Sequence, residues 1–144
     1  FNNTSLGMMN SETNFDSIIF RGTLQYLGSN LFKELSNAIK LLKTNGFIFI
    51  YSLPNKDSFM FYLLKEKWNL FNPNEHKLFF NENSMNYLAK VFNLKVLEIT
   101  YPYINTAYSN KYKDYETLVE MIRTNKLKNI PFWGNIMQVV LQKK

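Results

Sequence analysis

The stretch that decides the fold is LLKTNGFIFIYSLPN, residues 41–55, in which a polar turn leads into an unbroken apolar run. Residues 30–43 place apolar side chains at helical spacing, so we expect a helix before the turn. Asn45 and Gly46 suit the left-handed conformation that ends a helix. The run 47–51 is typical of a strand that is buried on both faces of a parallel sheet.

Strand and helix patterns alternate on both sides of this stretch. Residues 15–22, FDSIIFRG, precede it and form a short apolar strand that leaves through a glycine. The patterns that follow predict a helix at 56–67, a helix capped by Asn81 or Asn83, a strand at 94–101, a helix marked by Tyr115, Leu118, Val119 and Ile122, and a strand at 136–141. This alternation predicts an α/β fold with a mostly parallel sheet.

Composition limits the classes of function. The 144 residues are 46% hydrophobic, enough for one folded domain, and they include no cysteine and one histidine. Disulfides are therefore excluded, and we expect no metal site, because structural zinc needs several Cys or His ligands. No apolar run approaches the roughly 18 residues of a membrane helix. With no secretion signal, we expect a cytoplasmic chain without a membrane partner.

The net charge of +6 raises the question of a nucleic-acid partner. The lysines are spread along the chain, and the densest groups are Lys65 with Lys67 and Lys126 with Lys128. Dispersed lysines favour a diffuse surface charge over a dedicated basic face. We therefore do not expect a nucleic-acid partner, although the sequence does not exclude one. The sequence does not indicate the oligomeric state.

Four ordered segments resemble the C-terminal half of class I S-adenosylmethionine-dependent methyltransferases. They are FDSIIFRGTLQYL (15–27), LLKTNGFIFIYSLPN (41–55), NPNEHKLFFNENSMNYLAKVFNLKVLEI (72–99) and PFWGNIMQVVLQK (131–143). The second resembles the family's LLKPGG turn and strand, and the third its Pro-x-x-Glu-His segment before a helix. The resemblance implies a partial Rossmann-like sheet with flanking helices. Its four strands would stand in the order first, second, fourth, third, with the last one antiparallel.

The chain departs from the family in three places, one of which is the LLKPGG turn, where Thr44 and Asn45 replace the proline and the first glycine. Family members often have Leu-Glu-His after the first of these strands, where this chain has Leu24, Gln25 and Tyr26. None of the five glycines forms the G-x-G-x-x-G turn that holds such cofactors. We expect residues 15–144 to be the C-terminal half of a methyltransferase domain, and 1–14 a flexible segment or the end of a preceding element. A natural short protein that has lost cofactor binding is the alternative.

The resemblance also implies where ligands would bind. Arg21, Gly22, Thr23 and Leu24 would contact the methionine part of S-adenosylmethionine, most of which the absent half would hold. A further set would bind the acceptor, and it comprises Pro54, Asn55, Trp68, Phe80 and Tyr103. Several of these residues have a simpler explanation. Gly22 and Pro54-Asn55 suit ordinary turns, aromatics that follow a helix commonly fill the core, and Tyr103 would be an ordinary exposed loop tyrosine.

The single histidine, His76, follows Glu75 in the third of these segments. A histidine titrates near neutral pH, so His76 is a candidate base that removes the acceptor's proton, with Glu75 orienting it. Alternatively, His76 hydrogen-bonds the backbone of its own turn and braces the next helix, or it contacts the substrate without proton transfer.

The sequence therefore predicts methyl transfer from S-adenosylmethionine to a small-molecule or sugar-like acceptor, with this chain forming the acceptor side. Two alternatives remain. One is a non-catalytic methyltransferase-like binding module, and the other is an RNA-directed methyltransferase, which needs lysines that converge on one face.

Overall fold

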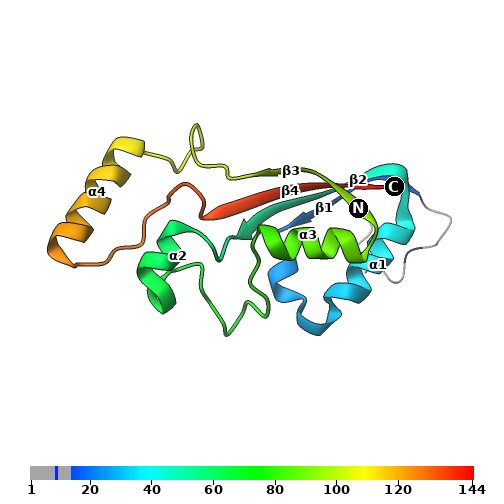
Figure 1. Ribbon diagram of the computed structural model, residues 1–144, viewed down its shortest axis with the longest axis horizontal. Coiled ribbons are helices and arrows are strands. Elements are labelled where there is room, and N and C mark those ends of the chain that lie inside the picture. Colours follow the sequence, from blue (N-terminus) through cyan, green and yellow to red (C-terminus); the bar gives the residue numbers. More distant parts are fainter. Residues whose placement is uncertain (1–8, 10–13) are drawn as a thin grey trace.

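The fold is built on one four-stranded sheet (Figure 1). The computed structural model describes residue 9 and residues 14–144, so the expected segment 1–14 lies almost entirely outside the described residues. The strands are β1 (Phe15–Arg21), β2 (Leu42–Pro54), β3 (Leu94–Thr100) and β4 (Ile136–Lys143), in the order β1-β2-β4-β3. β1 is parallel to β2, whereas β4 is antiparallel to both β2 and β3. The predicted α/β class, strand order and antiparallel last strand are confirmed. The sheet is mixed rather than mostly parallel, since two of its three strand pairs are antiparallel.

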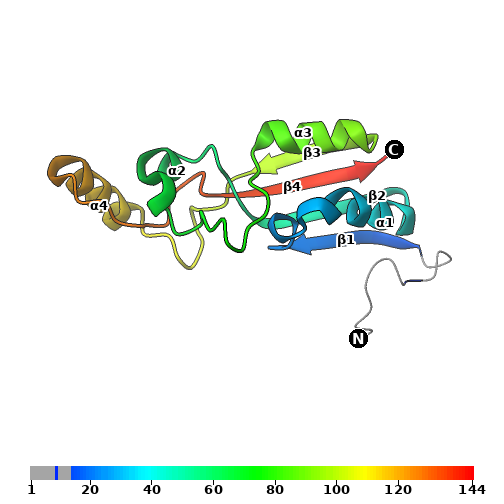
Figure 2. The same cartoon turned by 90° about the horizontal axis from the view of Figure 1, so that it is seen from below.

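Two helices, α1 (Leu31–Leu41) and α3 (Glu82–Val91), lie on the same face of the sheet, as Figures 1 and 2 show from two directions. Their buried side chains recur every three or four residues, as expected of amphipathic helices. These residues are Leu31, Leu35, Ala38 and Leu41 in α1, and Met85, Leu88 and Ala89 in α3. They pack against the inward side chains of the strands and form the main core between the helices and the sheet.

The opposite face of the sheet has no such helix layer among the described residues. On β2, Ile48 and Ile50 are fully buried toward the helices, but Phe47, Phe49 and Tyr51 on the other face are only half-buried. These three rings form a row with centroid separations of 6.2 and 6.0 Å. The expectation that β2 is buried on both faces is wrong, because an apolar run does not reveal whether a second layer covers it.

The turn that enters β2 behaves partly as predicted. α1 ends at Leu41, and Asn45 takes the left-handed conformation with φ 62°. Gly46 serves another purpose: a Cβ there would lie 2.8 Å from Leu42 Cγ and 3.1 Å from the carbonyl oxygen of Asp16. A third contact, 2.9 Å from the carbonyl oxygen of Lys43, also lies at the start of β2. The glycine is therefore needed mainly for this tight turn, and also for the approach of β2 to β1.

A second, smaller core lies beyond the sheet and involves α2 (Phe59–Leu64) and α4 (Lys111–Thr124). It contains Met60, Leu64, Trp68 and Met121. The helix expected at 56–67 is shorter than predicted, because Ser58 caps its start and Lys65 has a positive φ at its end. Lys65–Lys67 continues as a short 3-10 turn.

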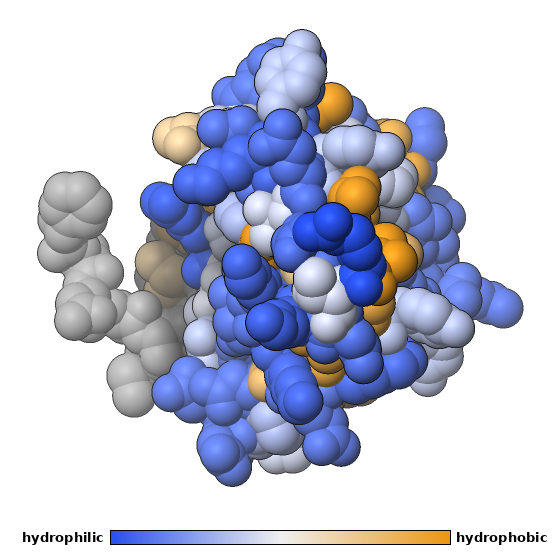
Figure 3. Space-filling model, turned by 90° about the vertical axis from the view of Figure 1, so that its left-hand side faces the viewer, coloured by the Kyte–Doolittle hydropathy of each residue, from blue (hydrophilic) through white to orange (hydrophobic). Residues whose placement is uncertain are grey.

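The helix α4 is confirmed, and of the four residues that mark it in the sequence only Leu118 is buried. Tyr115, Val119 and Ile122 are exposed, and the buried residues are Asp114, Leu118 and Met121. Figure 3 looks at the molecule from the side on which α4 lies, where hydrophilic surface surrounds scattered hydrophobic groups. Both faces of α4 carry apolar residues, so the pattern alone does not decide which face is buried.

Candidate functional site at the carboxyl edge of the sheet

Four segments of the chain meet at one edge of the sheet. The carboxyl ends of β1, β2 and β3 lie there because these strands run in the same direction, and β4 begins there because it runs the other way. This is the edge at which open α/β sheets bind their ligands.

A strap formed by residues 76–80 crosses this edge. The backbone N–H groups of Lys77 and Leu78 donate to the carbonyl oxygen of Gln25, at 2.7 and 3.1 Å. At the other end of the strap, Lys56 N donates to the carbonyl oxygen of Phe80 at 2.9 Å. The strap therefore fixes His76 near the end of β1 and Phe80 near the end of β2.

His76 lies in this strap with 8% of its surface exposed. Its Nδ1 is 3.2 Å from the carbonyl oxygen of Leu70, and its Nε2 is 3.3 Å from the hydroxyl of Tyr26. A carbonyl oxygen can only accept, so Nδ1 carries the proton and Nε2 offers its lone pair to the Tyr26 hydroxyl. The backbone N–H of His76 also donates to Asn72 at 2.7 Å.

These contacts separate the possible roles of the Glu75–His76 pair. Glu75 is exposed, and both ring nitrogens of His76 are occupied by Leu70 and Tyr26, so the expectation that Glu75 orients His76 is wrong in this geometry. The bond to Leu70 braces the segment that His76 belongs to. Tyr26, whose ring meets the imidazole edge-on, replaces Glu75 as the partner that faces the imidazole.

The end of β1 contains the four residues predicted to contact the cofactor. Gly22 has φ +57° and donates its backbone N–H to Tyr51 at 2.9 Å, while Arg21 and Thr23 are exposed. Leu24 is fully buried in the main core, which favours a packing role. The buried residue that sequence analysis did not select is Gln25, although its departure from the family pattern marks the position.

The chemistry of Gly22 and of the nearby Gln25 fits part of S-adenosylmethionine. Gly22 brings backbone without a Cβ to the end of β1, and the buried Gln25 Oε1 has no hydrogen-bond partner among the described residues. A buried polar atom without a partner costs about 1–3 kcal/mol, so a ligand that donates to it gains binding energy. The α-ammonium group of S-adenosylmethionine is such a donor. Because the sequence lacks the G-x-G-x-x-G turn, the described residues fit only the methionine end.

Pro54 and Asn55 end β2, and both are buried. The Asn55 side chain donates to Gly134 O at 2.9 Å and accepts from Asp57 N at 3.1 Å. Its backbone N–H donates to Asn135 O at 2.9 Å. Asn55 thus joins the end of β2 to the start of β4 and holds this part of the edge in place.

The three aromatic residues predicted to contact the acceptor are all buried. Trp68 is 1% exposed and packs in the second core, and Phe80 packs in the main core. Tyr103 donates to Asp114 at the start of α4, and burial together with this carboxylate raises the pKa of Tyr103 to about 12. For Trp68 and Phe80 this burial favours core packing, and Tyr103 is buried rather than an exposed loop residue. Contact of these three rings with an acceptor stays a prediction.

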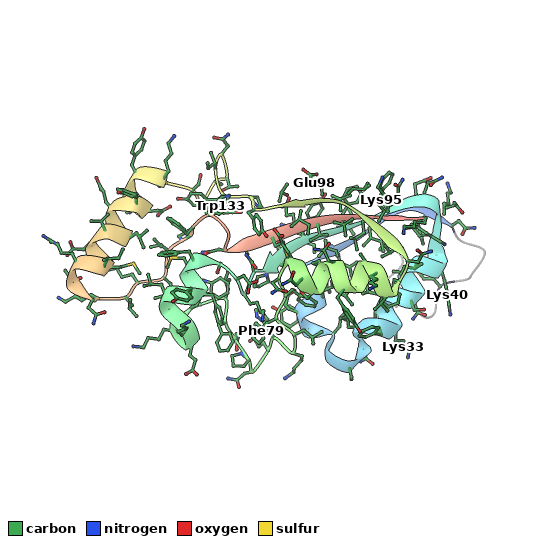
Figure 4. All side chains as sticks on the ribbon, in the orientation of Figure 1. Lys33, Lys40, Phe79, Lys95, Glu98 and Trp133 are labelled. Carbon is green, nitrogen blue, oxygen red and sulfur yellow. The ribbon has the colours of Figure 1, made fainter. Side chains whose placement is uncertain are left out.

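A cavity of about 390 Å³ lies at the carboxyl edge between the ends of β2 and β3. It is lined by Asn55, Asp57, Ser58, Phe59, Glu82, Asn83, Tyr101, Trp133 and Gly134. Asn55 is the one predicted acceptor residue in this lining. Figure 4 shows Trp133 on the loop that enters β4. The sequence does not single out the other residues, because none of the segments that contribute them contains a recognisable motif.

The polar groups of the cavity converge on Tyr101. Its hydroxyl donates to the carboxylate of Glu82, and its ring meets that of Trp133 edge to face, with centroids 5.6 Å apart. Burial raises the pKa of Tyr101 above its ordinary value, and the nearby carboxylates of Glu82 and Asp57 raise it further. Asp57 is held by Asn81 Nδ2 at 2.8 Å, and Asn81 also caps α3.

Within the described part of the chain, no group of three or more His, Cys, Asp or Glu side chains is placed to hold a metal ion. None of the helices in that same part has the length and apolar character needed to cross a membrane.

Comparison with known proteins supports the fold. No protein-family model and no curated protein matches the chain. Among solved structures, the chain is similar to a SAM-dependent methyltransferase from Archaeoglobus fulgidus, with a TM-score of 0.56 and 17% identity over 91% of this chain and 60% of that one.

A second similar structure comes from Thermotoga maritima, a SAM-dependent methyltransferase described as a possible histamine N-methyltransferase. Its TM-score is 0.54 at 17% identity, and the match covers 92% of this chain and 57% of that one. This chain thus spans less than two thirds of the length of either protein. At this identity the likeness establishes the architecture: the chain has the α/β fold of S-adenosylmethionine-dependent methyltransferases.

Proposed function

We propose that this chain forms the acceptor side of an S-adenosylmethionine-dependent methyltransferase that acts on a small-molecule or sugar-like acceptor. The observation that carries the proposal is the shared fold, which extends over 91% of the chain in the match to the Archaeoglobus fulgidus protein. A cavity of ligand size, about 390 Å³, lies at the edge of the sheet where such folds bind ligands.

The chain's own part in the reaction is to position the acceptor and remove its proton. S-adenosylmethionine, when bound, would supply an electrophilic methyl group on a sulfonium sulfur. Tyr26 is 48% exposed whereas His76 is 8% exposed, so Tyr26 is the member of the pair that can meet an acceptor. Its oxygen takes the acceptor's proton while its own proton passes to His76 Nε2, which faces it at 3.3 Å.

The donor side of the site would come from another part of a methyltransferase domain. β1 pairs with β2 on one side, and its other edge is open among the described residues. Ile19 on this strand is 61% exposed, beside the half-buried Phe49. A strand and helices that bind S-adenosylmethionine would pair with this edge and cover the bare face of the sheet.

The same open edge favours one alternative, a non-catalytic module that uses β1 to join a partner chain. An RNA-directed enzyme has less support. Lys33 and Lys40 lie on α1, whereas Lys95 lies on β3 across the sheet from it (Figure 4). Lysines placed on both sides do not make the single basic face that nucleic acid requires.

The experiment that tests the proposal is a titration of the ¹⁵N-labelled chain with S-adenosylmethionine, followed by NMR. The backbone amide of Gly22 and the side-chain amide of Gln25 should shift, with weak affinity because only the methionine end is contacted. Gln25→Met keeps the size of the side chain and should weaken binding at least about tenfold, since a hydrogen bond to a charged group contributes about 1.5–3 kcal/mol.

The matched control is Gln138→Met on β4, which should leave the affinity unchanged. The proposal fails if S-adenosylmethionine shifts neither amide at the end of β1, or if both variants weaken binding equally.

A further inference from the structure

Aromatic rings form one wall of the cavity between the ends of β2 and β3. Tyr101 and Trp133 meet edge to face, and Phe59 stands at the rim with its ring against Phe132. Trp133 is 58% exposed, although a ring of this size gains most when it is buried. An exposed aromatic surface that lines a cavity is typical of a ligand site.

Two carboxylates, Asp57 and Glu82, line the same cavity. The two ion pairs found among the described residues are Lys43–Asp16 and Arg123–Glu120, so neither carboxylate is neutralised in this way. None of the described residues in the lining is a Lys, Arg or His, and Lys56 does not line the cavity although it lies between Asn55 and Asp57. On a chain with net charge +6, this cavity is a local region of negative charge.

Hydrogen bonds fix both carboxylates. Asn81 Nδ2 donates to Asp57 Oδ2 at 2.8 Å, and the hydroxyl of Tyr101 donates to Glu82. Asn81 is itself held by a reciprocal capping box with Ser84 at the start of α3. The site is therefore organised before a ligand arrives, which reduces the entropy lost on binding.

We propose that this cavity binds a small organic cation, an ammonium compound whose charged group lies between the two carboxylates and the faces of Trp133 and Tyr101. Aromatic faces attract cations through the ring quadrupole, and they favour quaternary ammonium groups in particular. The carboxylates add Coulomb attraction and repel anionic ligands. A volume of about 390 Å³ accommodates a small molecule. The same cavity also supports the proposed function, but the inference does not rest on that function, because binding of a cation needs no methyl transfer.

Two probes of the same shape test the role of charge. Choline carries a quaternary nitrogen, and 3,3-dimethylbutan-1-ol has a neutral carbon at the same position. In NMR titrations of the ¹⁵N-labelled chain, choline should shift the indole N–H of Trp133 and bind about tenfold or more tightly than the neutral alcohol. Trp68, buried in the second core, provides an internal control whose indole N–H should not move.

Three variants test the residues. Glu82→Gln should weaken choline binding at least about threefold, whereas Glu116→Gln on the exposed surface of α4 changes the net charge equally and should have no effect. Trp133→Leu alters an exposed loop residue, keeps the fold intact, and should weaken binding about tenfold.

The proposal is overturned if choline leaves the Trp133 indole unmoved, or if the neutral alcohol binds equally well. It is also overturned if Glu116→Gln weakens binding as much as Glu82→Gln does, because the attraction would then belong to the whole molecule. Each of these measurements is made without S-adenosylmethionine, so its result is independent of methyl transfer.

Discussion

His76 has its two ring nitrogens in different surroundings. Nδ1 donates to the carbonyl oxygen of Leu70, which precedes the strap in sequence, whereas Nε2 faces the hydroxyl of Tyr26, which is partly exposed. The bond to Leu70 holds the backbone in place, and the contact with Tyr26 lies near the surface. The same side chain can therefore brace the strap and accept a proton, and the two roles can be separated by substitution.

Replacing His76 with Asn or Gln should separate these roles. Asparagine places an amide N–H close to the position of Nδ1, so His76→Asn should keep most of the stability. His76→Gln loses that position and leaves the Leu70 carbonyl unpaired, which should lower the free energy of unfolding by about 1–3 kcal/mol. Urea unfolding of both variants measures the difference. Equal stability losses would show that the bond to Leu70 does not hold the strap.

Tyr103 provides a second test at this scale, through pH. Burial and the Asp114 carboxylate raise its pKa in the folded chain to about 12, above the ordinary value of about 10. A group whose pKa is raised by folding stabilises the fold fully below the unfolded pKa. Its contribution should thus be complete below pH of about 10 and be lost as the pH rises through about 12.

Thermal unfolding of the native chain and Tyr103→Phe between pH 8 and pH 11 measures this contribution. The native chain should have the higher melting temperature at pH 8. The difference in melting temperature should narrow toward pH 11, because the Tyr103 hydroxyl of the unfolded chain loses its proton first. The other tyrosines are the same in both proteins, so their effects cancel in the comparison. A gap that stays constant with pH would show that the bond to Asp114 does not stabilise the fold.

The turn from α1 into β2 lies where the pairing of β1 with β2 begins, so its conformation affects the stability of the sheet. Gly46 lies where β1 and β2 begin to pair, and a Cβ at this position would lie 2.8 Å from Leu42 Cγ. Gly46→Ala should therefore lower the free energy of unfolding by about 1–3 kcal/mol through overpacking. The matched control is Asn45→Gly, which suits the φ of 62° at the neighbouring position and should change stability by less than about 1 kcal/mol. If urea unfolding gives the same free energy of unfolding for both variants, the lack of a side chain at Gly46 does not determine the stability of the fold.

The elements themselves could be predicted well from the sequence. The turn at Asn45, the cap at Asn81 and the apolar strands mark their own boundaries, because local conformation depends on nearby residues. The buried face of α4 and the exposed face of β2 could not be predicted. Burial of either face depends on whether another element, distant in sequence, packs against it. The periodicity of apolar residues does not identify that element.

At the scale of the whole molecule, the candidate site is assembled from distant segments. Asp57, Glu82, Tyr101 and Trp133 come from four different parts of the chain and meet because three strands end and one begins at the same edge. The sequence predicted that edge and Asn55 within it. It did not predict the lining, because the spacing of these residues along the chain contains no motif, and their meeting is a consequence of the strand order.

The molecule is also one-sided. Helices α1 and α3 cover one face of the sheet, whereas the aromatic row on β2 and the outer edge of β1 have no cover among the described residues (Figures 1 and 2). Open strand edges readily accept another strand. A donor half that adds a strand at β1 would complete the sheet and bring a cofactor site next to Gly22 and Gln25.

Amide hydrogen exchange of β1, with and without a donor half, tests this account most directly. The donor half would be the part of the Archaeoglobus fulgidus methyltransferase that has no counterpart in this chain. Alone, the β1 amides that point away from β2 should exchange rapidly, because no partner strand protects them. With the donor half present, those amides should become protected, while the amides of β3 at the far edge stay unchanged. Outer β1 amides that are already protected in the chain alone, or that stay unprotected when the donor half is bound, would contradict the claim that this chain is one side of a divided methyltransferase site.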